Sequence, residues 1–252
     1  MKKIIILLVL ITIAFNGYAQ KESETQKSNI QTYTPSKLLK NGQWDIKWFN
    51  NLYTETRSTF QDGKIPRATF FTSSIETYTG VDEDKRWNVG VILKIRSNVI
   101  NDRPALDVFK FDGDANTARS GLTSIAPSVK FVPFENIGNF SVQSSFYIPL
   151  VDEETTNNVF LDQKGFTFQN RFFYDYTLPS GDWQLFTELN TEYHFGEKSV
   201  QDNNGNTIEG SFANKTSVLA PGIFMSYFPS DKSTILGFVQ HYQRFGDFTQ
   251  NF

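Results

Sequence analysis

The stretch that decides the fold runs from Phe166 to Phe195 and reads FTFQNRFFYDYT LPSGD WQLFTELNTEYHF. From Trp183 onward, odd-numbered positions hold apolar, aromatic or threonine residues, and even-numbered positions hold polar or charged residues, with Phe186 as the exception. Successive side chains of a strand point to opposite faces, so this alternation predicts a strand with one apolar and one charged wall. Residues 178–182 contain Pro179 and Gly181 and predict the turn of a hairpin.

The charged wall of this hairpin mixes both signs of charge. Arg171 and Asp175 lie in its first half, and Glu188 and Glu192 lie in its second. A wall that faces bulk water needs no balance of charge, whereas side chains that face one another across a narrow lumen neutralise each other. The pattern therefore favours a closed membrane barrel with its apolar wall against lipid.

Composition narrows the class of protein. The chain has 252 residues, a formal net charge of −3, no cysteine and 15% aromatic residues. After the first 20 residues no apolar run approaches the roughly 20 residues that a membrane-spanning helix needs. The near-neutral charge gives no electrostatic footprint for nucleic acid, and the lack of cysteine excludes disulfides and thiol catalysis.

The amino terminus has the three parts of an export signal. Lys2 and Lys3 precede an apolar run over residues 4–15, and Ala19 ends a group of small residues at the cleavage position. The residues that follow are polar, and Pro35 breaks any helix there. These features predict a signal peptide over 1–19, a flexible periplasmic segment over 20–42 and a β-barrel domain over 43–252.

Nine segments of the chain carry a strand pattern. Short connections fall at Pro133, Pro179 and Pro229, and a long polar loop lies between each pair, as in outer-membrane barrels. Bacterial barrels use even strand numbers, so we expect an all-β, antiparallel transmembrane barrel of about 10–12 strands. Either a weak strand lies in 67–78 or 98–110, or the sequence stops before the last strand. The nine segments are 44–57, 67–78, 87–96, 122–131, 140–150, 166–176, 183–195, 218–228 and 235–245.

The leader ends in Tyr18-Ala19-Gln20, the segment GQWDIKWF stands at 42–49, and the hairpins are rich in aromatic residues. In these features the sequence resembles outer-membrane β-barrel proteins of the Bacteroidota. It implies a location in the outer membrane and passive transport, and it carries no catalytic residues with it.

Two groups of side chains are candidates for a role in such a barrel. Polar residues on the charged parity are expected to line the lumen, and amphipathic rings near strand ends are expected in the headgroup zone. The predicted lumen residues are Lys94, Arg96, Arg171, Asp175, Glu188, Glu192 and Arg244, and the predicted interface aromatics are Trp44, Trp48, Trp87, Trp183 and Tyr193.

No catalytic site emerges from the sequence. Barrel lipases place a serine two residues after the catalytic histidine, but Gly196 follows His194 at that distance and Gln243 follows His241. Glu188 and Glu192, four residues apart on one strand face, are separated by about 13 Å, too far to share a proton. The sequence therefore predicts no enzyme activity and no cofactor.

A calcium site is only weakly indicated. Asp112, Asp114 and Asn116 have the one-three-five spacing of a calcium loop, but Thr117 and Thr123 replace the turn glycine and the closing acid. We therefore predict a solvated polar loop and no metal site there.

Two functions remain open at this point. The first is an outer-membrane barrel, either a passive channel for small solutes or a structural envelope protein, with outer-membrane lipid and lipopolysaccharide as its partners. The alternative is a secreted or periplasmic β-sandwich that binds glycan or protein through its loops.

Overall fold

The structure is a computed structural model that describes residues 36–57, 63–113, 116–196, 200–201, 205–208 and 215–246. The predicted signal peptide lies outside these ranges. The described residues form one antiparallel sheet of ten strands, two small two-stranded sheets and a short 3-10 helix. No helix in these ranges is long and apolar enough to cross a membrane. The prediction of an all-β, antiparallel fold is confirmed.

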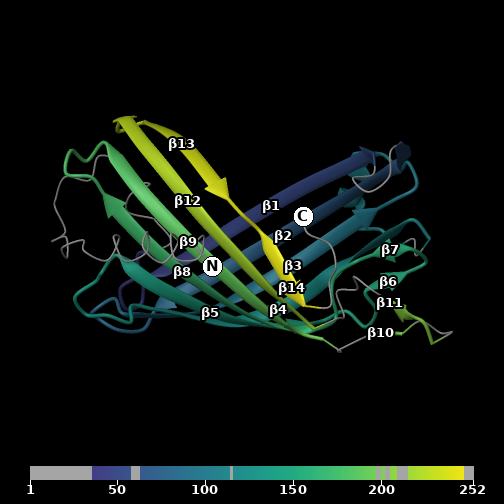
Figure 1. Ribbon diagram of the computed structural model, residues 1–252, viewed down its shortest axis with the longest axis horizontal. Helices are drawn as coiled ribbons and strands as arrows, with labels where there is room; N and C mark the ends of the chain where they lie inside the picture. Colours follow the sequence, from purple (N-terminus) through teal and green to yellow (C-terminus); the bar gives the residue numbers. More distant parts are fainter. Residues whose placement is uncertain are drawn as a thin grey trace, which may run out of the picture.

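The strands of the large sheet from β1 to β13 follow one another in chain order, and β14 pairs with β12 beyond the end of β13 (Figure 1). The sheet is strongly curled into a half-barrel whose two edges stay apart: among described residues β1 pairs only with β2, and β13 and β14 pair only with β12. Its strands are β1 (Trp44–Arg57), β2 (Lys64–Gly80), β3 (Trp87–Val99), β4 (Ala118–Phe131), β5 (Phe140–Pro149), β8 (Phe166–Thr177), β9 (Trp183–Phe195), β12 (Thr216–Ser230), β13 (Ser233–Gln240) and β14 (Gln243–Gly246).

The connections differ in length at the two ends of the sheet. The turn end holds residues 81–86, 132–139, 178–182 and 231–232, and the loop end holds the short connection between β1 and β2 and the long ones between β3 and β4, β5 and β8, and β9 and β12. The predicted alternation of short and long connections is thus present from β2 onward (Figure 1). The loops contain η1 (Ala105–Lys110), the pair β6 (Thr155–Thr156) and β7 (Val159–Phe160), and the pair β10 (Val200–Gln201) and β11 (Thr207–Ile208).

The strand predicted over 235–245 is interrupted in its middle. Gly222 lies opposite Gln240 and Leu219 lies opposite Gln243, so β13 and β14 share one register against β12. Between these two pairs stands Pro221, which has no N–H to donate to the neighbouring strand. Its carbonyl still accepts a hydrogen bond from the N–H of His241 at 2.9 Å. The break in the ladder therefore follows from the proline.

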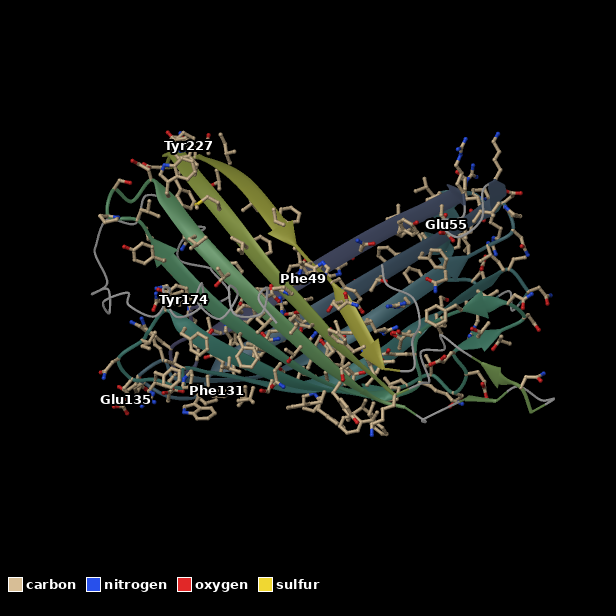
Figure 2. All side chains as sticks on the ribbon, viewed as in Figure 1. Phe49, Glu55, Phe131, Glu135, Tyr174 and Tyr227 are labelled. Carbon is tan, nitrogen blue, oxygen red and sulfur yellow. The ribbon has the colours of Figure 1, made fainter. Side chains whose placement is uncertain are left out.

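The sheet has two chemically different faces. We call the concave face, which carries Arg171 and Glu188, the inner face, and the opposite one the outer face. On β9 the inner residues Gln184 and His194 are 2% and 4% exposed, whereas the outer residue Trp183 is 40% exposed. Most of the exposed large apolar side chains in the middle of the sheet are on the outer face, many of them with aromatic rings (Figure 2).

Outer-face rings from neighbouring strands stack at both ends of the sheet. At the turn end, the ring centroids of Trp183 and Tyr227 are 4.5 Å apart, and a second pair joins β3 to β4. At the loop end, the rings of Phe146 and Phe166 are 5.6 Å apart. Such cross-strand aromatic pairs stabilise a sheet and fix its register.

The inner face is packed tightly around one glycine. A Cβ atom on Gly90 would lie 2.3 Å from the carbonyl oxygen of Thr77 and 2.5 Å from the ring of Tyr78. The Tyr78 hydroxyl reaches Ser128 Oγ at 2.7 Å, which in turn is 2.7 Å from Ser145 Oγ. Gly90, Ser128 and Ser145 are small and therefore leave the space that Tyr78 fills.

We predict that Gly90→Ala destabilises the folded sheet. The added methyl group forces Tyr78 or the backbone to move, so the free energy of unfolding in urea should fall by about 1–3 kcal/mol. Gly121→Ala is the matched control, because a Cβ there has no atom within 4 Å. Equal unfolding free energies for the two variants would contradict this packing.

Candidate functional site

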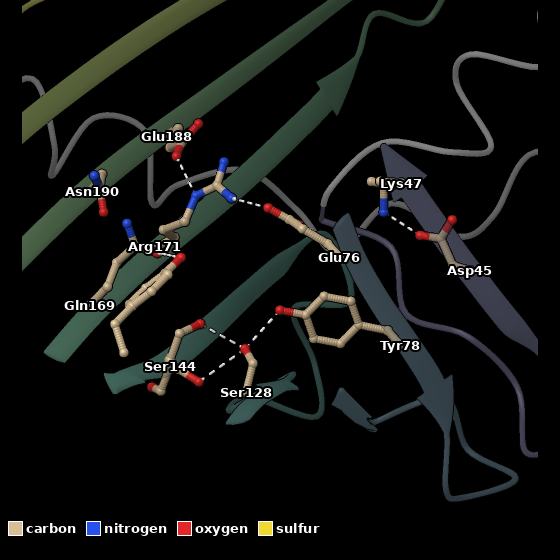
Figure 3. Close-up of polar contacts among 12 residues, drawn as sticks. Asp45, Lys47, Glu76, Tyr78, Ser128, Ser144, Gln169, Arg171, Glu188 and Asn190 are labelled. Carbon is tan, nitrogen blue, oxygen red and sulfur yellow. Dashed lines mark hydrogen bonds and ion pairs between the residues drawn. The ribbon is translucent and has the colours of Figure 1, made fainter. Parts of the chain in front are cut away.

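An ion-paired arginine lies at the centre of the inner face. Arg171 Nε on β8 donates to Glu188 Oε1 on β9 at 2.7 Å, and its Nη1 is 3.9 Å from Glu76 Oε1 on β2 (Figure 3). These side chains are 25%, 10% and 13% exposed, respectively. Since β3, β4 and β5 separate β2 from β8 in the sheet, the contact with Glu76 crosses the concavity. The arginine thus ties opposite walls together.

A small pocket of about 50 Å³ opens beside this arginine. Side chains from β1, β2, β3, β4, β5 and β8 line it, and Lys37 and Leu39 close it from within. On its β1 side, the Lys47 ammonium donates to the Asp45 carboxylate. Most of the residues that line the pocket are therefore polar, and they include charges of both signs.

Residues 36–41, which we call the inner segment, lie inside the concavity before β1 begins. Ser36 is fully buried and its hydroxyl donates to the Asp175 carboxylate. The Leu39 N–H donates to Asn88 Oδ1 at 3.2 Å, and a Cβ on Gly80 would lie 2.1 Å from the Lys40 carbonyl oxygen. The described part of the predicted flexible segment 20–42 is thus packed against the inner face.

The loop between β5 and β8 lies across the inner face at the loop end. Asn98 Nδ2 donates to the Phe160 carbonyl at 2.7 Å, and the Arg119 guanidinium donates to backbone carbonyls of the same loop at 2.8–3.1 Å. Arg96 Nε is 3.4 Å from Asp162 Oδ2, which is also on this loop. The concavity is therefore narrowed at both ends, by the inner segment and by this loop.

The seven polar residues predicted to line a lumen all occupy inner-face positions, but they do not form one cluster. Arg171 meets Glu188, as described above, and Asp175 meets the inner segment. Lys94 lies 5.1 Å over the ring of Tyr147, and Arg96 pairs with the loop. Their role in a conducting lumen stays a prediction.

The remaining predicted lumen acid, Glu192, accepts hydrogen bonds instead of forming an ion pair with arginine or lysine. Gln169 Nε2 donates to it at 2.8 Å and Asn190 Nδ2 at 3.0 Å, and His194 Nε2 is 3.4 Å away. The other nitrogen of His194 is 2.8 Å from Thr167 Oγ1, not from a serine. Arg244 lies on β14 and is 8% exposed.

The five predicted interface aromatics lie on the outer face, four of them at the turn end or within four residues of it and one at the loop end. Trp44, Trp87 and Trp183 are the first residues of β1, β3 and β9 and are 40–65% exposed. Trp48 lies four residues inside β1, and its indole N–H donates to Ser73 Oγ at 2.7 Å. Tyr193 lies at the loop end, with its ring 4.7 Å from that of Phe195. Their contact with a membrane interface stays a prediction.

The sequence reasoning missed a row of inner-face phenylalanines. The ring centroids of Phe173 and Phe186 are 5.9 Å apart, those of Phe186 and Phe224 are 5.5 Å apart, and those of Phe224 and Phe238 are 5.5 Å apart. The signal was present at Phe186, which breaks the polar parity of its strand. Its apolar ring is on the polar face because it meets rings from the neighbouring strands.

In the loop where the sequence weakly indicated a calcium site, an arginine contacts the acidic side chains. Arg103 Nη2 is 2.5 Å from Asp112 Oδ2 and 3.0 Å from Asp107 Oδ2. Lys110 and Arg103 together hold the pKa of the Asp107 carboxyl below its usual value. Asp114 lies outside the described residues, and within them no cluster of His, Asp or Glu is placed to hold a metal ion.

Removing the central arginine should leave two acids without their counter-charge. We predict that Arg171→Met lowers the free energy of unfolding by about 3 kcal/mol, since breaking a largely buried ion pair is more costly than replacing it. The double variant Arg171→Met/Glu188→Gln should recover part of that loss in the same urea titration. A double variant as unstable as the single one would argue against the ion pair.

Three comparisons with known proteins bear on this architecture. No protein-family model matches the chain, and no curated protein does. Among solved structures, the chain is similar to the COG4313 outer membrane channel from Pseudomonas putida F1, with a TM-score of 0.51 and 8% sequence identity over 88% of this chain and 76% of the channel. At this identity the likeness concerns the fold. It supports the resemblance to an outer-membrane barrel, but not the narrower resemblance to the Bacteroidota type. The described residues therefore share their fold with this channel, as an open half-barrel.

Proposed function

We propose that this chain is an outer-membrane β-barrel protein that lets small solutes cross passively. The observation that carries the proposal is the sorting of side chains by the curled sheet. Polar and charged residues gather on the concave face, while exposed apolar and aromatic residues cover the convex face. A soluble two-layer protein would bury the apolar face instead.

The outer face has the dimensions of a membrane band. On β9, Trp183 and Phe195 mark the two aromatic levels and are 40% and 49% exposed. Twelve residues separate them, or about 40 Å along the strand, which a tilt of about 45° reduces to roughly 28 Å across the bilayer. This height is close to the apolar band of outer-membrane barrels, with lipid and lipopolysaccharide as the proposed partners.

The inner face suits small solutes. Side chains fill much of the space inside barrels of few strands, so a narrow path is expected. Here the inner segment, the loop between β5 and β8, and the pair of Arg171 and Glu188 all narrow it further. Walls lined by ion pairs favour the passage of water and small polar solutes over that of large or apolar solutes. No catalytic step is proposed.

The proposal is tested by location and by conductance. The protein should fractionate with outer membranes, migrate differently on gels when unheated, and produce discrete current steps in planar bilayers. Phe186→Ala should raise the conductance, because it removes an inner ring, whereas Leu185→Ala, the adjacent outer-face variant, should leave it unchanged.

Three other outcomes would each point elsewhere. A protein that is soluble without detergent would favour the β-sandwich that binds glycan or protein. Membrane insertion without current steps would favour a structural role in the envelope. Equal changes from Phe186→Ala and Leu185→Ala would mean that the current does not pass along the inner face.

A further inference from the structure

One row of the inner face holds more hydrogen-bond donors than the protein satisfies. Lys130 on β4 lies opposite Gln143 on β5, and Gln143 lies opposite Arg171 on β8, so the three side chains stand side by side across neighbouring strands. All three line the pocket described above. Because they belong to paired strands, their spacing is fixed by the sheet.

Lys130 is a buried lysine that forms no ion pair within the described part of the chain. Its residue is 6% exposed, and among the described residues no carboxylate lies within ion-pair distance of its ammonium. The ammonium donates to the Lys37 carbonyl at 3.2 Å and lies 5.3 Å from the ring centroid of Phe173. An ammonium has three N–H donors, so one carbonyl leaves two of them unfilled.

Gln143 is the second residue of the row with an unfilled donor. It is 4% exposed, and its Nε2 has no hydrogen-bond partner. A buried amide nitrogen without a partner costs about 1–3 kcal/mol, which is a reason to expect a ligand atom there. Gln169, one strand away on the same face, shows the contrast, because its Nε2 donates to Glu192 at 2.8 Å.

The residues around the pocket carry more positive than negative charge. The described residues that line it include four cations, Lys37, Lys47, Lys130 and Arg171, but only two acids, Asp45 and Glu76. Lys47 contacts Asp45, and Glu76 lies 3.9 Å from Arg171. The arginine keeps further N–H donors beyond those it directs at Glu188 and Glu76. An anion would supply both the missing acceptor and the missing negative charge.

We propose that Lys130, Gln143 and Arg171 form a binding site for an oxyanion, the carboxylate or phosphate group of a small solute. This inference rests on the proposed channel for its route of entry, because the anion reaches the site along the inner face. Lys130 and Arg171 attract the charge, and Gln143 orients one oxygen through its amide N–H. The Lys37 carbonyl holds the ammonium in place while the site is empty.

The site is tested by titrating the folded, detergent-solubilised protein with inorganic phosphate and, separately, with acetate, using calorimetry at constant ionic strength. We expect at least one of the two anions to bind. Binding of phosphate alone would assign a phosphate site, and binding of acetate would assign a carboxylate site. Gln143→Leu and Lys130→Met should each weaken binding about tenfold or more, as expected for one charge-assisted hydrogen bond.

Two matched variants control for unspecific loss. Gln169→Leu and Lys94→Met remove the same side chains from other positions of the inner face, and they should leave the dissociation constant within about twofold. Gln143→Glu, which places an acid beside Lys130, should abolish binding while keeping the volume of the side chain. It serves as the second variant if Gln143→Leu fails to fold.

The anion site and the channel can be rejected independently of each other. Failure of both anions to bind the wild-type protein, or equal weakening by the control variants, would overturn the oxyanion site even if planar bilayers show current steps. Specific binding without any current would uphold the site and reject the channel.

Discussion

Backbone hydrogen bonding is the constraint on which the rest of this structure depends. In the membrane location proposed above, no water is available to satisfy the N–H and C=O groups of the chain, so its strands must pair side by side along their full length. β8 and β9 do this without a register shift from the pair Phe166 and Phe195 to the pair Thr177 and Gln184. Pairing of that kind fixes which side chains share a face. Once the outer row is apolar, the inner row has to accommodate every charge that the strands carry.

Many polar groups of the inner face form hydrogen bonds or ion pairs with one another. Arg171 takes two acids, the Tyr78 hydroxyl meets a serine, and Glu192 accepts from two amides. The inner segment and the loop between β5 and β8 fill part of the space that remains inside the concavity. Other buried polar atoms of this face also lack a partner among the described residues, including Asn190 Oδ1 and Thr216 Oγ1. Lys130 and Gln143 differ from these because their incompletely used donors lie side by side on paired strands and line a pocket that holds more cations than acids.

The local pattern predicted the strands and the order of long and short connections, because alternation and turn residues are properties of a few neighbouring positions. It also placed Arg171 and Glu188 on one face. It did not predict that Arg96 meets Asp162 of a loop, or that Ser36 lies buried against Asp175, because both contacts join segments far apart in the sequence. The break between β13 and β14 arises from Pro221 on the partner strand, so the sequence of the broken strand holds no sign of it. Nothing in the sequence distinguishes Lys130 from other lysines at polar strand positions, because the residues around it come from other parts of the chain.

The central claim, that the row from Trp183 to Phe195 faces lipid, is tested most directly by a spin-label scan of β9. The chain has no cysteine, so one label can be placed at each position without background. In lipid vesicles, collision with oxygen should peak at positions 185, 187, 189 and 191, and collision with a water-soluble nickel complex should be low there. If those four labels are shielded from both reagents, while labels at 188, 190 and 192 collide freely with the nickel complex, the apolar row is buried between protein layers and the account is contradicted.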